Sequence, residues 1–311
     1  MPENESYTTE EIAQILKVSK LTVYDLIKKG KLPAYRVGRQ MRVDASDLEE
    51  YKNKEKRIRK SEGSIVKGNN TVKIPQQNSR SVIISGQDNC LDLLTKYLEK
   101  EAIGIRPLRS YVGSLDSLIT MYKGEADIVS THLYDSETGE FNIPYIRRIL
   151  VSNPLIVVNL ITRQSGFYVA KGNPKKISKF KDLLSDNVKL INREKGSGAR
   201  IFLDEKLREE GICPADIKGY LNEETSHLGV GGIISKGVAD VGIGTEKVAK
   251  IVGVDFIPLI NERYDLVMLK SEENKQLIST ILRILQSGTL KEELASIGYD
   301  VSNTGNIMYE Q

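Results

Sequence analysis

The stretch NREKGSGARIFLDEKL, residues 192–207, predicts a turn and a helix that continue from a strand. An apolar strand signal at 188–191 precedes it, and apolar residues recur at helical spacing from Ala199 to about Glu210. Gly196, Ser197 and Gly198 form the turn. Two glycines so close together cost backbone entropy on folding. We therefore expect another group to approach the main chain at this turn.

The same unit recurs through the rest of residues 81–311. Short apolar strands are predicted at 81–85, 109–112, 126–129 and 239–243. The turns that follow them are Ser85-Gly86, Gly113-Ser114, Thr131-His132 and Gly244-Thr245. Units of this length build an α/β fold with a parallel sheet and right-handed crossovers. Two further apolar runs, 155–161 and 264–269, are expected to be strands that cross between two lobes.

Each turn is expected where a strand ends and a helix begins, which is the edge of an open α/β sheet where ligands bind. Helix N-termini offer unpaired N–H groups and a partial positive charge, and small residues let an anion reach them. Any one such turn is more often a plain connection, whereas five together favour a shared pocket. Arg200 is a candidate counter-charge. The Gly-Ser-Gly turn fits neither a P-loop nor a nucleophile elbow.

Residues 1–53 predict a small separate domain. Thr8 and Glu11 form a capping box for a first short helix, and Ser19 is a candidate N-cap for a second helix that Gly30 ends. Two short helices joined in this way are a helix-turn-helix. Residues 34–43 are expected to form a hairpin wing, and a third helix is expected to begin at Ser46. Residues 54–80 are polar and predict a linker.

Basic charge is concentrated at the N-terminus, as expected for a segment that faces phosphate. Residues 1–60 hold 14 Lys and Arg against 10 Asp and Glu. In a helix-turn-helix the start of the second helix enters the major groove. The alternative is a helix-turn-helix that serves protein contacts only. The candidate DNA-binding residues are Ser19, Lys20, Thr22, Tyr24 and Lys28 on the second helix and Arg36, Arg39 and Arg42 on the wing.

The N-terminal domain resembles the excisionase family of winged helix-turn-helix domains, relatives of the mercury-resistance-regulator type. The resemblance covers about 45 residues and includes the wing motif L-P-x-x-R-V-G-R at 32–39. It implies binding to double-stranded DNA. A recombination directionality factor stays an alternative, although such factors are generally small and this chain carries a large second domain.

Residues 81–311 resemble type II periplasmic binding proteins, and more narrowly the periplasmic-binding-protein-like domain linked to molybdenum-cofactor biosynthesis proteins and molybdate-type regulators. The matching motifs include Thr131-His132-Leu133, Gly172-Asn173-Pro174 and N-R-x-x-G-S-G-x-R at 192–200. The resemblance implies a two-lobed clamshell that acts as a receptor. The implied ligand is molybdate, tungstate or a precursor of the cofactor.

One departure from the molybdate carriers concerns a tyrosine that they place after the strand equivalent to 241–243. Here Gly244-Thr245 follows, and Tyr264 or Tyr134 is the candidate substitute. The available cationic and donor side chains exceed what a tetrahedral oxyanion needs, so a larger anion stays open. The candidate ligand-binding residues are Ser85, Gly86, Ser114, Thr131, His132, Arg163, Arg193, Ser197, Gly198, Arg200, His227 and Tyr264.

Composition narrows the class of protein. Of the 311 residues, 40% are hydrophobic and 28% charged, which is typical of a globular chain, and the absence of Trp leaves few rings for stacking on bases. Cys90 and Cys213 stand far apart, so we expect reduced thiols, no disulfide and no metal. The acidic, polar N-terminus does not resemble a secretory signal, and the apolar run 155–162 is too short to span a bilayer.

We expect a cytoplasmic, one-component transcription regulator in which a small anionic effector controls DNA binding. Short DNA-binding modules bind weakly alone, so a homodimer on a palindromic site is expected. No catalytic residue and no cofactor is expected. The alternative is an enzyme or accessory protein of molybdenum-cofactor biosynthesis.

Overall fold

The computed structural model describes residues 6–16, 18–30, 32–38, 40–49, 51–52 and 79–311. The chain divides into two compact units, 1–74 and 75–311, which are described separately. Apart from residues 79 and 80, the linker expected at 54–80 lies outside the described residues.

The N-terminal unit is a helix-turn-helix with a three-stranded antiparallel sheet of order β1-β3-β2. The Thr8 amide donates to the Glu11 carboxylate at 2.7 Å, so the expected capping box opens α1. Ser19 caps α2, since its Oγ accepts from the Thr22 amide at 3.1 Å. The elements are β1 (Ser6–Thr8), α1 (Thr9–Leu16), α2 (Lys20–Lys28), β2 (Tyr35–Val37) and β3 (Gln40–Asp44), followed by helical residues 45–49 and 51–52.

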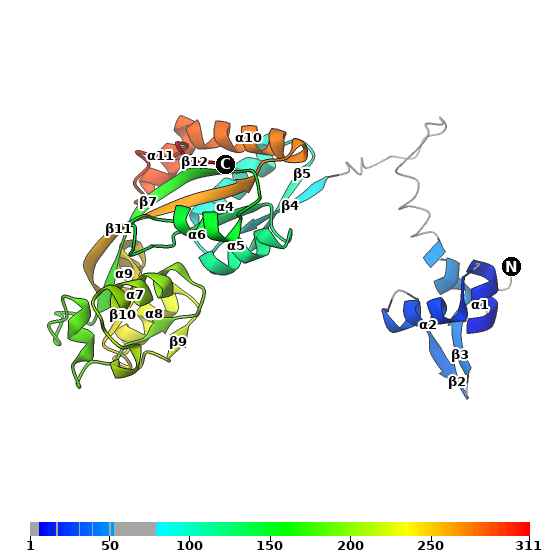
Figure 1. Ribbon diagram of the computed structural model, residues 1–311, viewed down its shortest axis with the longest axis horizontal. Coiled ribbons are helices and arrows are strands. Elements are labelled where there is room, and N and C mark those ends of the chain that lie inside the picture. The colour runs from blue at the N-terminus through cyan, green and yellow to red at the C-terminus, as the bar shows by residue number, and fades with distance from the viewer. Residues whose placement is uncertain (1–5, 17, 31, 39, 50, 53–78) are drawn as a thin grey trace. The chain divides into compact units, whose positions relative to one another are not determined.

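The C-terminal unit is a two-lobed α/β structure (Figure 1). The first lobe contains β4 (Arg80–Ser85), α4 (Cys90–Glu101), β5 (Ile105–Ser110), α5 (Ser114–Tyr122), β6 (Ile128–Thr131), α6 (Ile143–Ile149), η4 (Glu272–Asn274), α10 (Lys275–Gln286), α11 (Gly288–Ser296) and β12 (Ile307–Glu310). The second contains η2 (Phe180–Leu184), β8 (Asn192–Arg193), α7 (Gly198–Glu209), η3 (Pro214–Asp216), β9 (Glu223–Glu224), α8 (His227–Ser235), β10 (Val241–Thr245) and α9 (Glu246–Val252).

Two long strands, β7 (Leu155–Val169) and β11 (Asp255–Leu269), pair antiparallel and run from one lobe to the other (Figure 1). The main sheet has the order β10-β7-β11-β6-β4-β5, and β12 also pairs with β7. Among the described residues, the β4–β5 and β4–β6 ladders of this sheet are parallel and its other ladders are antiparallel. The expected parallel sheet is therefore found for three strands of the first lobe, whereas in the second lobe the parallel ladder among the described residues is the short β8–β9 pair of a separate sheet.

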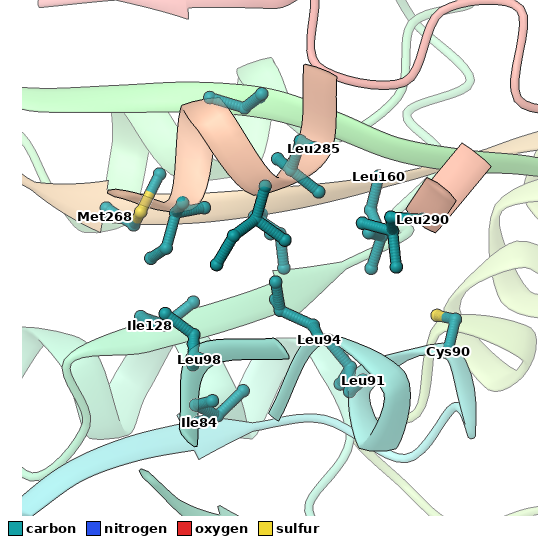
Figure 2. Packing of buried hydrophobic residues seen from close by; sticks show 14 of the residues in the cluster. Ile84, Cys90, Leu91, Leu94, Leu98, Ile128, Leu160, Met268, Leu285 and Leu290 are labelled. Atoms are coloured by element: carbon teal, nitrogen blue, oxygen red, sulfur yellow. The ribbon is translucent and has the colours of Figure 1, made fainter. Parts of the chain in front are cut away.

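Each lobe has its own hydrophobic core. In the first lobe, Leu94 and Leu98 of α4 point toward α10, and Leu285 points back from α10 (Figure 2). In the second lobe, the Phe180 ring packs edge-on against the Phe167 and Phe202 rings, with centroids 5.1 and 6.0 Å apart. Separate cores allow each lobe to act as a rigid body. Among the described residues, no helix has both the length and the apolar character that a membrane span requires.

Candidate functional site

A cavity of about 470 Å³ lies where the two lobes meet. Its wall is built from the starts of α4, α8 and α9, from the crossing strands β7 and β11, and from β8. Among the predicted ligand residues, His132, Arg163, Arg193, His227 and Tyr264 line it. A second cavity of about 460 Å³, between α10 and β12, contains none of the predicted ligand residues.

Arg163 is buried in the cavity wall with two carboxylates. Its guanidinium donates to Glu262 (Nε to Oε1, 2.7 Å) and pairs with Asp88. The guanidinium also lies over the Tyr264 ring, 4.7 Å from its centroid. Burial would raise the pKa of Asp88, but the charge of Arg163 and the hydrogen bonds from the Cys90 amide and Tyr299 hydroxyl lower it below its ordinary value. Arg163 is thus neutralised by the protein itself.

Arg193 is also buried and joins the two lobes. Its Nη2 donates to Gln87 Oε1 at 2.6 Å, and its Nε donates to Glu194 at 2.7 Å. Gln87 comes from the first lobe, and its amide donates back to Glu194 at 3.0 Å. Burial raises the pKa of Glu194, but the hydrogen bond and charge of Arg193 outweigh burial and lower it. Glu194 therefore stays ionised and balances Arg193.

The two histidines line the cavity as neutral rings. Burial lowers the pKa of His132 to about 4, an effect that the charge of Glu262 opposes and that of Arg163 reinforces. Burial and the charges of Arg193 and Arg163 hold the pKa of His227 well below its ordinary value. His132 stacks on Tyr264 with centroids 5.2 Å apart, and its Nδ1 lies 2.9 Å from Ser114 Oγ. His227 Nδ1 is buried without a hydrogen-bond partner among the described residues.

Lys247 is the cavity cation that sequence reasoning missed. Its Nζ lies over the Tyr299 ring, 4.5 Å from the centroid and 3.5 Å from the hydroxyl oxygen. Within the described part of the chain, Lys247 forms no ion pair, unlike Arg163 and Arg193. A signal was present, since Lys247 follows the predicted Gly244-Thr245 turn by two residues and Thr245 also lines the cavity.

The Gly-Ser-Gly turn does not line the cavity, contrary to expectation. The Leu115 amide donates to the Gly196 carbonyl at 3.0 Å, and a Cβ on Gly198 would lie 2.2 Å from the His132 ring. Arg200 is buried and pairs with Asp204 (3.2 Å) and Glu223 (2.9 Å). The group that approaches the main chain here is therefore the first lobe, and Arg200 is not available as a counter-charge.

Other predicted ligand residues also lie outside the cavity lining. Ser85 Oγ is 2.9 Å from Ser117 Oγ, and Ser197 Oγ donates to the Glu194 carbonyl at 2.9 Å. Gly86 provides the space in which Ser130 Oγ packs against the chain. Thr131 is buried, and its Oγ1 has no partner among the described residues. Tyr134 belongs to the core of the second lobe.

The predicted DNA-binding residues of α2 share an exposed face. Lys20, Tyr24 and Lys28 are exposed at helical spacing, and Lys20 pairs with Glu10 of α1. Thr22 Oγ1 lies 2.8 Å from the Oγ of Ser19, so these two hydroxyls help to cap the helix.

The wing carries the remaining candidates. Arg36 on β2 is exposed. Arg42 on β3 is half-buried, because its guanidinium donates to the carbonyl and hydroxyl oxygens of Ser6, each at 3.2 Å. Arg39 lies outside the described residues.

Comparison with known proteins gives two family matches. A model described as PBP superfamily domain matches residues 95–286, and one described as helix-turn-helix domain matches residues 6–56. The uncharacterized protein YvgK of Bacillus subtilis is 51% identical over 313 residues and covers all of both chains.

Two similar solved structures belong to transport proteins. One is a putative phosphate ABC transporter substrate-binding protein from Clostridium perfringens with bound phosphate, at 16% identity and a TM-score of 0.52 over 71% of this chain and 99% of that chain. The other is a tungstate ABC transporter from Geobacter sulfurreducens, at 11% identity and a TM-score of 0.52 over 70% of this chain and 98% of that chain. At these identities the likeness shows the fold. The helix-turn-helix domain suggests DNA binding, and the PBP-like domain suggests binding of a small ligand.

Proposed function

We propose that this chain, which belongs to the PBP superfamily, is a DNA-binding transcription regulator whose two-lobed domain senses a small anionic molecule. The observation that carries the proposal is a cavity between two lobes, in which Lys247 has no carboxylate partner among the described residues, in a chain that also has a helix-turn-helix domain. Since operator DNA is the partner, we place the protein in the cytoplasm. We expect it to act as a homodimer, because one short module binds DNA weakly.

Contacts between the lobes offer a way to couple ligand and DNA. Gln87, which precedes α4, bridges to Arg193, and Leu115 of α5 bridges to Gly196, so the lobes touch at two separate points. A ligand shifts an equilibrium between open and closed lobes only by its difference in affinity for the two forms. A ligand enclosed by both lobes meets that condition, because the open form lacks half of its contacts.

The first effectors to test are molybdate, tungstate and anions related to the molybdenum cofactor. The sequence resemblance points to them, and two structural neighbours are a tungstate transporter and a protein with bound phosphate.

We propose a binding protein rather than an enzyme. Burial raises the pKa of the Cys90 thiol well above its ordinary value, with further contributions from Asp88, which is the opposite of an activated nucleophile. The alternative, an enzyme of molybdenum-cofactor assembly, is tested by incubating the full chain with pterin and nucleotide substrates and looking for products by mass spectrometry.

The deciding experiment is a mobility-shift titration with DNA from upstream of the chain's own gene. We expect retardation at low salt, and a shift of the midpoint by about fivefold or more with the true effector. Arg36→Ala should weaken binding, whereas Lys181→Ala, which removes the same charge from an exposed site in the second lobe, should not. Absence of any retardation at low salt would contradict the proposed function.

A further inference from the structure

We propose that the ligand of the inter-lobe cavity is an organic monoanion with an apolar or aromatic body, and that Lys247 receives its anionic group. This inference rests on the proposed function and assigns a chemical class to the same site. A bare oxyanion consists of four oxygens around one central atom and would leave most of a 470 Å³ cavity to water. Cavities of this size ordinarily take organic ligands.

Part of the cavity lining consists of apolar side chains that are exposed to solvent. Tyr111, Leu228 and Ile251 all line the cavity, and they are 62%, 54% and 65% exposed. Val248 lies between Lys247 and Ile251 on α9 and contributes to the same part of the lining. Exposed apolar side chains gathered in a concave site indicate an apolar ligand surface that covers them. An oxyanion gains nothing from these side chains.

The ionic groups of the cavity favour a single negative charge on the ligand. Arg163 with Asp88 and Glu262 sums to one negative charge and Arg193 with Glu194 sums to zero, so neither arginine offers excess positive charge. Lys247 has only Tyr299 as a neighbour in the described part of the chain. Lys247 can therefore pair directly with one carboxylate, whereas the second charge of a dianion such as molybdate would meet no unpaired cation among the described residues of the lining.

A neutral donor near Lys247 fits the same class. Ser226 lines the cavity at the start of α8, and its hydroxyl accepts from the Gly229 amide at 3.0 Å, so its own hydrogen can be donated to a ligand. A carboxylate or ester oxygen at this end accepts hydrogen bonds from neutral groups without requiring a second charge. The ligand's polar end is therefore placed between α8 and α9, and its body lies against Leu228 and Ile251.

Calorimetric titration of the full chain tests the inference with 2-naphthoate, benzoate and acetate, which share a carboxylate and differ in apolar body, and with molybdate and phosphate. We expect 2-naphthoate to bind most tightly, then benzoate, with acetate and the oxyanions weakest. Lys247→Met should weaken 2-naphthoate binding about tenfold. The matched control is Lys250→Met, which removes the same charge from the same helix, where Lys250 pairs with Glu246 outside the cavity.

Ile251→Ser should weaken 2-naphthoate binding and leave acetate binding unchanged, because only the larger ligand reaches the apolar part of the lining. Tighter binding of molybdate than of 2-naphthoate, or equal losses in Lys247→Met and Lys250→Met, would overturn the inference. Failure of the regulatory role looks different: 2-naphthoate then binds through Lys247 without changing the affinity for DNA. Conversely, if DNA binding responds to molybdate and none of the carboxylates binds, the proposed regulatory role stands and the organic monoanion is ruled out as the ligand.

Discussion

The backbone amide of Leu115 donates a hydrogen bond to the carbonyl oxygen of Gly196 at 3.0 Å, and this bond joins α5 of the first lobe to the turn before α7 of the second. The approach is close because Gly113 has no side chain. A Cβ at Gly113 would lie 2.6 Å from the Gly196 oxygen, and the obstructing atoms are all backbone. The contact between the lobes therefore depends on the absence of a side chain at position 113.

Gly113→Ala should separate the lobes without unfolding either of them. The added methyl group cannot be accommodated by a side-chain movement, so the α7 turn must retreat. Spin labels at Lys100→Cys and Lys236→Cys, one exposed site in each lobe, would report a longer distance in the variant. The background carries Cys213→Ser, because the Cys213 thiol is exposed whereas Cys90 is buried.

Gly288→Ala is the control, since a Cβ there meets nothing within 4 Å and α11 lies far along the chain from the inter-lobe contact. It should leave the label distance unchanged. An identical distance in Gly113→Ala and the parent would show that this contact does not hold the lobes together.

Arg163→Met should destabilise the C-terminal unit by about 3–5 kcal/mol, because it leaves Asp88 and Glu262 buried without their cation. Arg283→Met removes a guanidinium that is 62% exposed and pairs with Glu101, so its cost should stay below about 1 kcal/mol. Urea unfolding at pH 7 measures both. Equal costs would mean that the buried cluster contributes no more than a surface pair.

Arg163→Met should also unfold at a higher pH than the parent protein when the solution is acidified. In the parent, the pKa of Asp88 lies below its ordinary value of 3.8, so its contribution to stability is complete above that pH and is lost as the pH falls further. Without Arg163, burial of Asp88 is no longer opposed by a positive charge, and its pKa rises. Acid titrations followed by circular dichroism should show the variant's transition at higher pH than that of Arg283→Met.

The histidines make stability fall between pH 6.5 and about 4. Because burial lowers the pKa of His132 to about 4, the unfolded chain takes up a proton in this window that the folded chain does not. The free energy of unfolding then drops by up to about 1.4 kcal/mol per pH unit for each histidine, and it is fully regained above pH 6.5. His227, whose pKa is also lowered, adds to the slope.

Urea midpoints at pH 7 and pH 5 check this for the parent and for His132→Gln and His227→Gln. The two substitutions should each reduce the loss of stability on acidification, since glutamine takes up no proton in either state. Carboxylates contribute equally to all three proteins, so the difference isolates the histidines. An unchanged loss in both variants would show that the rings titrate normally in the fold.

The length of the crossing strands illustrates what sequence patterns can and cannot predict. The apolar runs 155–161 and 264–269 predicted the first part of β7 and the last part of β11. The remaining parts of both strands contain polar residues that interrupt the apolar pattern. Arg163 and Glu262 are in fact register partners in the β7–β11 ladder, so each neutralises the other in a buried strand. A hydrophobicity pattern cannot detect this, because the pairing joins residues about a hundred positions apart.

The Gly-Ser-Gly turn shows a similar limit at the site. Its glycines correctly predicted a close approach to the main chain, yet the approaching groups are the His132 ring and the α5 turn. Composition alone cannot distinguish a ligand from another part of the protein. The same limit applies to Arg200, whose carboxylate partner Glu223 becomes a neighbour only through the β8–β9 pairing.

The last prediction concerns the exposed wing residue Arg36. If it contacts a DNA phosphate, Arg36→Ala should weaken binding to all sequences alike and reduce the slope of log affinity against log salt by about 0.9. Tyr24→Ala, on the exposed face of α2, should instead change the preference among sequences and leave the salt slope unaltered. Fluorescence anisotropy at several salt concentrations, with specific and scrambled DNA, separates the two effects. A salt slope that is the same in Arg36→Ala and the parent would show that Arg36 does not contact a DNA phosphate, because the loss of a phosphate contact lowers the number of counterions released on binding.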